Sequence, residues 1–183
     1  VDRYAPAFTN YQHQAHNTNS LSHNGVLSFV EDSAGKLWIG TEGGLNVLDR
    51  STGNMTHYRH NPENPAGLPA PAVLSLLDEG KALWVGTWAG GLSRLNKATG
   101  EFIHFLAGDN KADSLNDDRV WSTYRDSRGT LWIGTYAGGL NRYNRETQSF
   151  THYQSDSEDP ISITSNGVTA IYEDSLGDFW VGT

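Results

Sequence analysis

A five-residue motif occurs four times in this chain at nearly constant spacing. Its copies occupy residues 37–41, 83–87, 131–135 and 179–183, and each reads Leu or Phe, Trp, Ile or Val, Gly, Thr. The four tryptophans are 46, 48 and 48 residues apart. A fixed period of about 20–50 residues is typical of propellers and solenoids, in which one supersecondary unit is used repeatedly. The repeat therefore constrains the fold more than any other feature of the chain.

The repeated unit extends beyond the motif and contains four predicted strands. In the first complete unit these are residues 26–30, 36–41, 45–49 and 55–59, which are rich in β-branched and aromatic side chains. An Asp-Ser-x-Gly turn separates the first two strands in three units, because Asp bonds the local backbone and Gly tolerates positive φ. The second unit shortens this turn to Asp78-Glu79-Gly80. Every unit thus has the same order of strands and turns.

Four antiparallel strands in each unit predict an all-β protein, a β-propeller of four-stranded blades. No stretch shows a sustained helical period. A β-sandwich would also contain many short strands, but it would not place the same residues at the same point of every unit. We therefore predict the propeller.

We expect a single propeller of about four blade-equivalents over residues 1–183. Complete blades are predicted at residues 20–60, 68–107 and 115–154. Residues 1–12 align with the third and fourth strands of a blade, and residues 163–183 contain the first and second. Pairing of the two ends would complete a split blade and hide sheet edges that otherwise favour aggregation. The sequence leaves open whether the assembled ring has four blades in one chain, seven blades, or eight blades made of two chains.

The third unit resembles the two-component regulator propeller repeat. The matching residues are Ser114-Leu115, Val120, Asp126, Gly129, the motif at 131–135, Gly138-Gly139-Leu140 and Asn144-Arg145. The resemblance implies seven-bladed sensor propellers in the periplasmic part of membrane-anchored hybrid histidine kinases or diguanylate cyclases, where they take part in sensing extracellular carbohydrate. It also implies a periplasmic or extracellular location, a glycan or small-molecule ligand, and the remaining domains of a longer receptor as partners. Since no kinase, cyclase, immunoglobulin-like or transmembrane segment is present, we expect a piece of such a receptor.

Composition excludes several other classes of function. Thirteen Lys and Arg against 21 Asp and Glu give a net charge of −8, which disfavours binding to nucleic acid. The chain has no cysteine, so it has neither disulfides nor thiolate metal sites. No apolar run approaches the length of a membrane span. We find no nucleophile elbow, phosphate loop or zinc-protease motif, and we predict no cofactor, no metal and no catalysis.

Several conspicuous side chains recur in every blade, and we predict structural roles for them. The motif tryptophans are expected to pack between blades rather than to stack on sugars; they are Trp38, Trp84, Trp132 and Trp180. The acidic pairs at 31–32, 78–79 and 173–174 resemble glycosidase carboxylates but recur at one turn, so they do not flank a single bond. His57, His104 and His152 recur on the fourth strand, where we expect solvated edge residues too far apart to share a metal.

A binding site is expected where the repeats differ, which is in the loops. The connections leading into each first strand and those between second and third strands are predicted to share one face around the central channel. Trp88 and Tyr136 lie in the latter loops, where they either stack on a sugar ring or cover a blade edge. The candidate ligand-binding residues are Trp88, Tyr136, Glu42, Arg119, Asn116, Asp117, His23, Asn24, Trp121 and Asn166.

Three classes of function remain open at this point. The first is a ligand-sensing module without chemistry, contributing to recognition of an extracellular carbohydrate or similar ligand. The second is a structural or interaction propeller fragment, including a homodimer that completes a larger ring. The third is a propeller polysaccharide lyase or hydrolase, for which Arg119, His23 and Asp117 are the available side chains. We favour the first because of the resemblance and because no unrepeated catalytic constellation is present.

Overall fold

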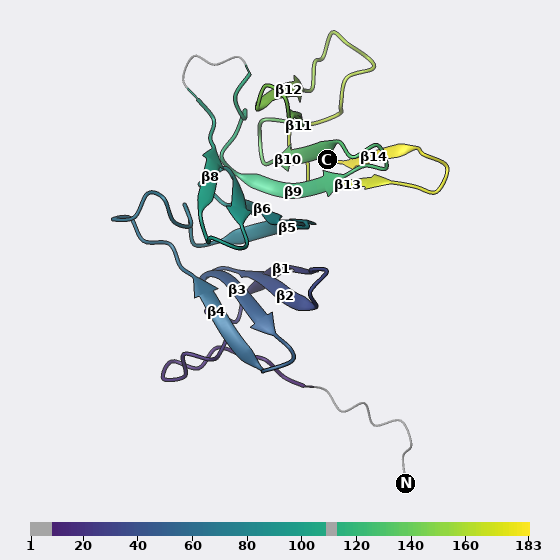
Figure 1. The fold of residues 1–183 in the computed structure, drawn as a ribbon. Coiled ribbons are helices and arrows are strands. Elements are labelled where there is room, and N and C mark those ends of the chain that lie inside the picture. The colour runs from purple at the N-terminus through teal and green to yellow at the C-terminus, as the bar shows by residue number, and fades with distance from the viewer. Residues whose placement is uncertain (1–8, 109–112) are drawn as a thin grey trace.

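The computed structural model describes residues 9–108 and 113–183, and these residues form strands and turns only (Figure 1). None of them forms a helix that could cross a membrane. The all-β class predicted from the sequence is confirmed.

The strands form three four-stranded antiparallel sheets and one two-stranded sheet, each in sequence order. The first blade contains β1 (Val26–Glu31), β2 (Lys36–Thr41), β3 (Gly44–Asp49) and β4 (Asn54–Tyr58). The second contains β5 (Val73–Glu79), β6 (Ala82–Thr87), β7 (Leu92–Asn96) and β8 (Phe102–Phe105). The third contains β9 (Val120–Arg125), β10 (Leu131–Thr135), β11 (Leu140–Asn144) and β12 (Ser149–Tyr153). The last sheet pairs β13 (Ala170–Glu173) with β14 (Phe179–Gly182). This is the strand pattern of successive propeller blades.

The sheets follow one another as an arc, with the first strand of each blade next to the first strand of its neighbour (Figure 1). Strands β1, β5, β9 and β13 therefore form the inner side of the arc. The glycine of the motif allows this close approach. A Cβ atom added at Gly86 would lie 2.6 Å from Cγ1 of Val120 in the next blade, which is too close for a real contact.

Hydrophobic side chains fill the two interfaces between complete blades. Trp38 and Val47 of the first blade pack with Leu83 and Val85 of the second. Trp84 packs in the same way against Ile133 and the rest of the third blade. The predicted packing between blades is thus observed for Trp38 and Trp84, both of which are buried.

The turn between the first two strands is tied to the motif tryptophan by a carboxylate. Asp32 Oδ1 accepts hydrogen bonds from the amides of Ala34 and Lys36, and Oδ2 accepts one from Trp38 Nε1 at 2.9 Å. The bonds from Trp132 to Asp126 and from Trp180 to Asp174 have the same length. In the second blade, with its shorter turn, Glu79 accepts the bond from Trp84 at 3.1 Å. The acidic residues of these turns therefore hold the blade together.

Trp180 differs from the other three motif tryptophans. This residue is 60% exposed, although its Nε1 still donates to Asp174. Trp132 packs against Phe179 of the last sheet, with ring centroids 4.8 Å apart. No sheet of the described residues covers the corresponding side of β14. In this structure Trp180 therefore lacks the predicted packing role.

The last sheet contains two strands among the described residues. The predicted third and fourth strands of this split blade fall on residues 1–12. Of these, residues 1–8 lie outside the described part of the chain, and residues 9–12 are not in a strand. Closure of the ring through the two ends stays a prediction.

The histidines on the fourth strands are not solvated edge residues, as the sequence had suggested. The Nε2 nitrogens of His57 and His152 donate to the carbonyl oxygens of Ser20 and Ser114, at 2.7 and 2.6 Å. A carbonyl oxygen can only accept, so each ring carries its proton on Nε2. These bonds fasten the segment that precedes each blade across its outer strands.

Candidate functional site

The two kinds of loop predicted to share one face are hydrogen-bonded to each other. The amide of Gly91, between the second and third strands of blade two, donates to the carbonyl of Asp118 at 2.8 Å. The amide of Tyr136 donates to the carbonyl of Arg119 at 2.9 Å within blade three. These bonds bring Trp88, Tyr136 and Arg119 to the same end of two adjacent blades.

A β-bulge brings a third aromatic side chain to this end. Val120 pairs with Thr135 and Ser122 pairs with Gly134, so Trp121 is an extra residue between two register positions. Bulges bend the strand and redirect the side chain of the extra residue, and they are frequent beside functional sites. The same bulge in β1 and β5 contains Leu27 and Leu74. Only the third blade places a tryptophan at this position.

Trp88, Trp121 and Tyr136 form one cluster, which we call the aromatic platform. The ring centroids of Trp88 lie 5.9 Å from Trp121 and 5.2 Å from Tyr136, both in edge-to-face geometry. Trp121 and Tyr136 are stacked at 5.8 Å with an interplanar angle of 16°. The three residues are 39%, 38% and 46% exposed, so they support one another and still present ring surface to solvent.

Arg119 lies over the platform and is held there by Asp117. Its guanidinium carbon is 4.6 Å from the ring centroid of Tyr136 and 6.0 Å from that of Trp88, within the range of cation–π attraction. Its Nε and Nη2 donate to the two carboxylate oxygens of Asp117, each at 2.9 Å. This bidentate geometry positions the guanidinium and leaves further N–H donors for a ligand.

The buried carboxylate of Asp117 remains ionised because it is well solvated by hydrogen bonds. Burial by itself would raise the pKa of Asp117, but bonds from the Arg119 side chain and from the amides of Arg119 and Ala137 lower it below its usual value. The same pairing raises the pKa of Arg119. The pair therefore keeps its geometry and its charges at neutral pH.

Three of the ten candidate residues thus form the platform, Arg119 and Asp117 lie beside it, and the other five lie elsewhere. His23 and Glu42 form a separate half-exposed pair in blade one, with Nδ1 of His23 3.4 Å from Oε2 of Glu42. The side-chain amide of Asn116 is hydrogen-bonded within blade three, where it donates to the carbonyl of Gly138 and accepts from Asn141.

Asn24 and Asn166 accept hydrogen bonds from the amides of His13 and Ser155, at 2.7 Å in both cases. Asp118, at the equivalent place in blade three, accepts one from Ala107. Periodic recurrence of Asn or Asp at this position is the sequence signal that separates such loop-holding residues from the platform.

The platform offers flat apolar surface and fixed hydrogen-bond donors but no catalytic constellation of its own. Among the described residues, no group of three His, Asp or Glu side chains could hold a metal ion. The chemistry that these residues support is stacking on a planar or weakly polar ring face together with donation to its oxygen atoms.

Comparison with known proteins agrees with this architecture. Residues 20–43, 114–137 and 162–183 match the family model for the two-component regulator propeller. No curated protein matches the chain. Among solved structures, the extracellular domain of a protein assigned as the hybrid two-component system BT4673 from B. thetaiotaomicron is similar, with a TM-score of 0.72 and 27% identity over 91% of this chain. The corresponding domain of BT3049 has a TM-score of 0.67 and 25% identity over 96% of this chain.

The chain spans 21% of the BT4673 domain and 28% of the BT3049 domain. Virginiamycin B lyase from Staphylococcus aureus is also similar, with a TM-score of 0.61, 14% identity and coverage of 85% of this chain and 48% of the lyase. At that identity the likeness concerns the fold alone. The BT4673 and BT3049 domains are extracellular domains of two-component systems, in line with the predicted location outside the cytoplasm. We conclude that three segments of the chain match the two-component regulator propeller repeat and that the chain is arranged as successive blades of a β-propeller.

Proposed function

We propose that this chain is a ligand-sensing propeller segment of a bacterial membrane-associated signalling receptor and that it has no catalytic activity of its own. Its ligand is an extracellular carbohydrate or a molecule of similar shape and polarity. The likeness to extracellular domains of two-component systems supports the sensor role. The remaining domains of the receptor would then be its partners.

The aromatic platform is the observation that carries this proposal. Pyranose rings have an apolar face of C–H groups and an edge of hydroxyls, so they stack on aromatic rings while their hydroxyls accept hydrogen bonds. Trp88, Trp121 and Tyr136 supply the rings, and Arg119 supplies donors in a direction set by Asp117. These residues lie in loops and in a bulge, where the repeats differ from one another.

Glycan-array binding followed by calorimetric titration of the best oligosaccharide tests the platform. Trp88→Ala or Tyr136→Ala should weaken binding by about 1–2 kcal/mol, roughly five- to thirtyfold in Kd, since each removes a ring from the contact surface. Trp180→Ala is the matched control, because Trp180 is an exposed tryptophan outside the platform. Equal loss in the control, or wild-type affinity in both platform variants, would contradict the proposal.

An interaction module is a second candidate, favoured by apolar side chains exposed at both ends of the arc. Phe29 on β1 is 73% exposed, and Tyr172 and Trp180 on the last sheet are each 60% exposed. The equivalents of Phe29 and Trp180 in the second blade, Leu76 and Trp84, pack against neighbouring blades. These surfaces therefore have the shape and composition to receive another blade, including one from a second copy of the chain.

A further inference from the structure

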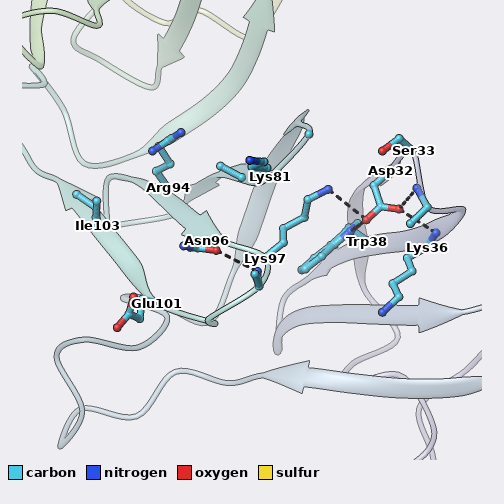
Figure 2. A pocket seen from close by; sticks show the side chains of 14 residues that line it. Asp32, Ser33, Lys36, Trp38, Lys81, Arg94, Asn96, Lys97, Glu101 and Ile103 are labelled. Carbon is cyan, nitrogen blue, oxygen red and sulfur yellow. Dashed lines mark hydrogen bonds and ion pairs between the residues drawn. The ribbon is translucent and has the colours of Figure 1, made fainter.

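A cavity of about 840 Å³ lies between the first two blades (Figure 2). The loops around it place it at the end of the blades opposite the aromatic platform. It is bordered by the turns that join first to second strands and third to fourth strands, whereas the platform is built from the other two kinds of loop. A local irregularity of the repeat lies at its border. Two residues, Gly80 and Lys81, connect β5 to β6, whereas four residues connect β1 to β2. Small side chains at Ala82 and Ala98 leave the remaining space unfilled.

The cavity is lined by four basic side chains, Lys36, Lys81, Arg94 and Lys97, and by two acidic ones, Asp32 and Glu101. This is an unusual concentration in a protein with a net charge of −8. Figure 2 shows Lys97 reaching across Trp38 to Asp32. Among the lining side chains, basic groups therefore outnumber acidic ones, and they lie beside a bridge between two blades.

The basic residues differ in whether their charge is already compensated. Lys97 Nζ is 3.2 Å from Asp32 and 2.7 Å from Asp78, and Arg94 Nε is 3.3 Å from Glu79. No carboxylate of the described residues lies within 4 Å of the ammonium group of Lys36 or Lys81. Lys36 lies opposite Asp49 on β3, and its ammonium group and that of Lys81 keep donors that are available to a ligand.

Arg94 and Lys97 recur as Arg142 and Arg145 in blade three, whereas Lys36 and Lys81 have no basic counterpart in the other blades. The cavity at the corresponding turns of the third and last blades is lined by the carboxylates of Asp126, Glu173 and Asp174, with Arg125 as its basic residue. Lys36 has the uncharged Ala82 and Thr130 as its counterparts in blades two and three. A residue type that departs from the repeat at the rim of a cavity is the pattern expected of a binding site.

We propose that this cavity binds an anionic group, a sulfate, phosphate or carboxylate carried by a small ligand, with Lys36 and Lys81 as its direct contacts. Ammonium groups donate up to three hydrogen bonds each and form short charge-assisted bonds to anionic oxygens. Lys97 adds a positive charge whose position is set by Asp32 and Asp78. The site is independent of the aromatic platform and adds a second recognition function to the chain.

Titration with sodium sulfate, sodium phosphate and sodium citrate, followed by NMR shifts of backbone amides, tests this site. Sodium chloride at matched ionic strength is the reference for general screening. We expect saturable shifts at the turns around residues 33–36 and 80–82 with at least one of the three anions. The anion with the lowest Kd identifies the group that the cavity prefers.

Lys36→Gln/Lys81→Gln should weaken that binding about tenfold, given the usual strength of exposed ion pairs. Arg59→Gln/Arg142→Gln is the matched control, because it removes the same charge from exposed positions outside the cavity. Trp88→Ala should leave anion binding unchanged, which separates this site from the platform. If all three anions act no differently from chloride, or if both double variants bind equally, the proposal is wrong. Circular dichroism of the variants controls for loss of folding. If the double lysine variant does not fold, the two single lysine variants replace it in the titration.

Discussion

At the scale of single residues, the Asp32 carboxylate accepts four hydrogen bonds that hold the first blade together and link it to the second. One oxygen holds the turn through two amides, and the other receives both Trp38 Nε1 and Lys97 Nζ. Burial alone would raise the pKa of Asp32, but the bonds from Trp38, the Lys36 amide and Lys97 lower it below the usual value. The ionised form is therefore the one that stabilises the fold.

This lowered pKa predicts a loss of stability in acid. Because the folded state holds the Asp32 proton less tightly than the unfolded chain, the contribution is complete above the unfolded pKa of about 4 and disappears as the pH falls through the folded value. Urea unfolding between pH 3 and pH 7 should show this dependence. Asp32→Asn should flatten it and should cost about 1–3 kcal/mol at pH 7, because an amide nitrogen cannot accept the bond from Trp38. The exposed Asp178→Asn serves as control, and equal effects of the two changes would contradict the assignment.

At the scale of elements, the motif tryptophan occupies the same position in every blade but is buried to a different extent in each. Trp84 is 0% exposed and its ring centroid lies 5.1 Å from that of Tyr143 in the next blade. Trp132 is partly exposed against the smaller last sheet, and Trp180 is uncovered. A residue that is invariant in the repeat therefore contributes unequally to stability.

The loss of stability on alanine substitution of these tryptophans should increase with their burial. Trp84→Ala should lower the free energy of unfolding by about 3–5 kcal/mol, because it empties a closed interface. Trp132→Ala should cost less, and Trp180→Ala should stay within about 1 kcal/mol of wild type, since it removes little buried surface. Chemical denaturation monitored by far-ultraviolet circular dichroism measures all three. Equal losses at the three positions would mean that β14 is covered as β6 is.

At the scale of the whole molecule, the arc has two exposed apolar ends and a distinct chemistry at each of its two faces. The aromatic platform lies at the end of blades two and three where second strands connect to third strands. The cationic cavity lies at the opposite end of blades one and two, where first strands connect to second strands. Rigid packing between blades fixes the relation between these sites, because the first strands of neighbouring blades are in direct contact.

The interaction candidate makes a prediction at this scale. If the exposed ends join two copies of the chain, light scattering should give twice the 20.1 kDa chain mass at high concentration. Trp180→Lys should restore the single-chain mass, because a buried unpaired charge is costly. Lys in place of the exposed Ile161, which lies outside the sheets, is the control. A mass of one chain at all concentrations would rule out this association.

Much of the blade was predictable because its determinants are local. Turn residues, alternation of side chains and the 46 to 48 residue period lie within one unit, and antiparallel strands joined by short turns pair with their neighbours in sequence. The bond made by His57 joins the fourth strand to Ser20, 37 positions away, and the exposure of Trp180 depends on a neighbouring sheet, so local patterns revealed neither. Of the site residues, Trp88 and Tyr136 were identified from the sequence because the repeats differ at their loops. The arrangement of the three rings in the platform was not predicted.

The sequence by itself determined the all-β class, the blade unit and the loops in which the repeats differ, because each of these depends on residues close together in the chain. Tertiary structure alone decided that the bulge at Trp121 completes the aromatic platform and that Lys97 meets Asp32, 65 positions away. The physical reason is that the direction of a bulged side chain and the gap between two blades depend on packing across the interface, which no single repeat encodes.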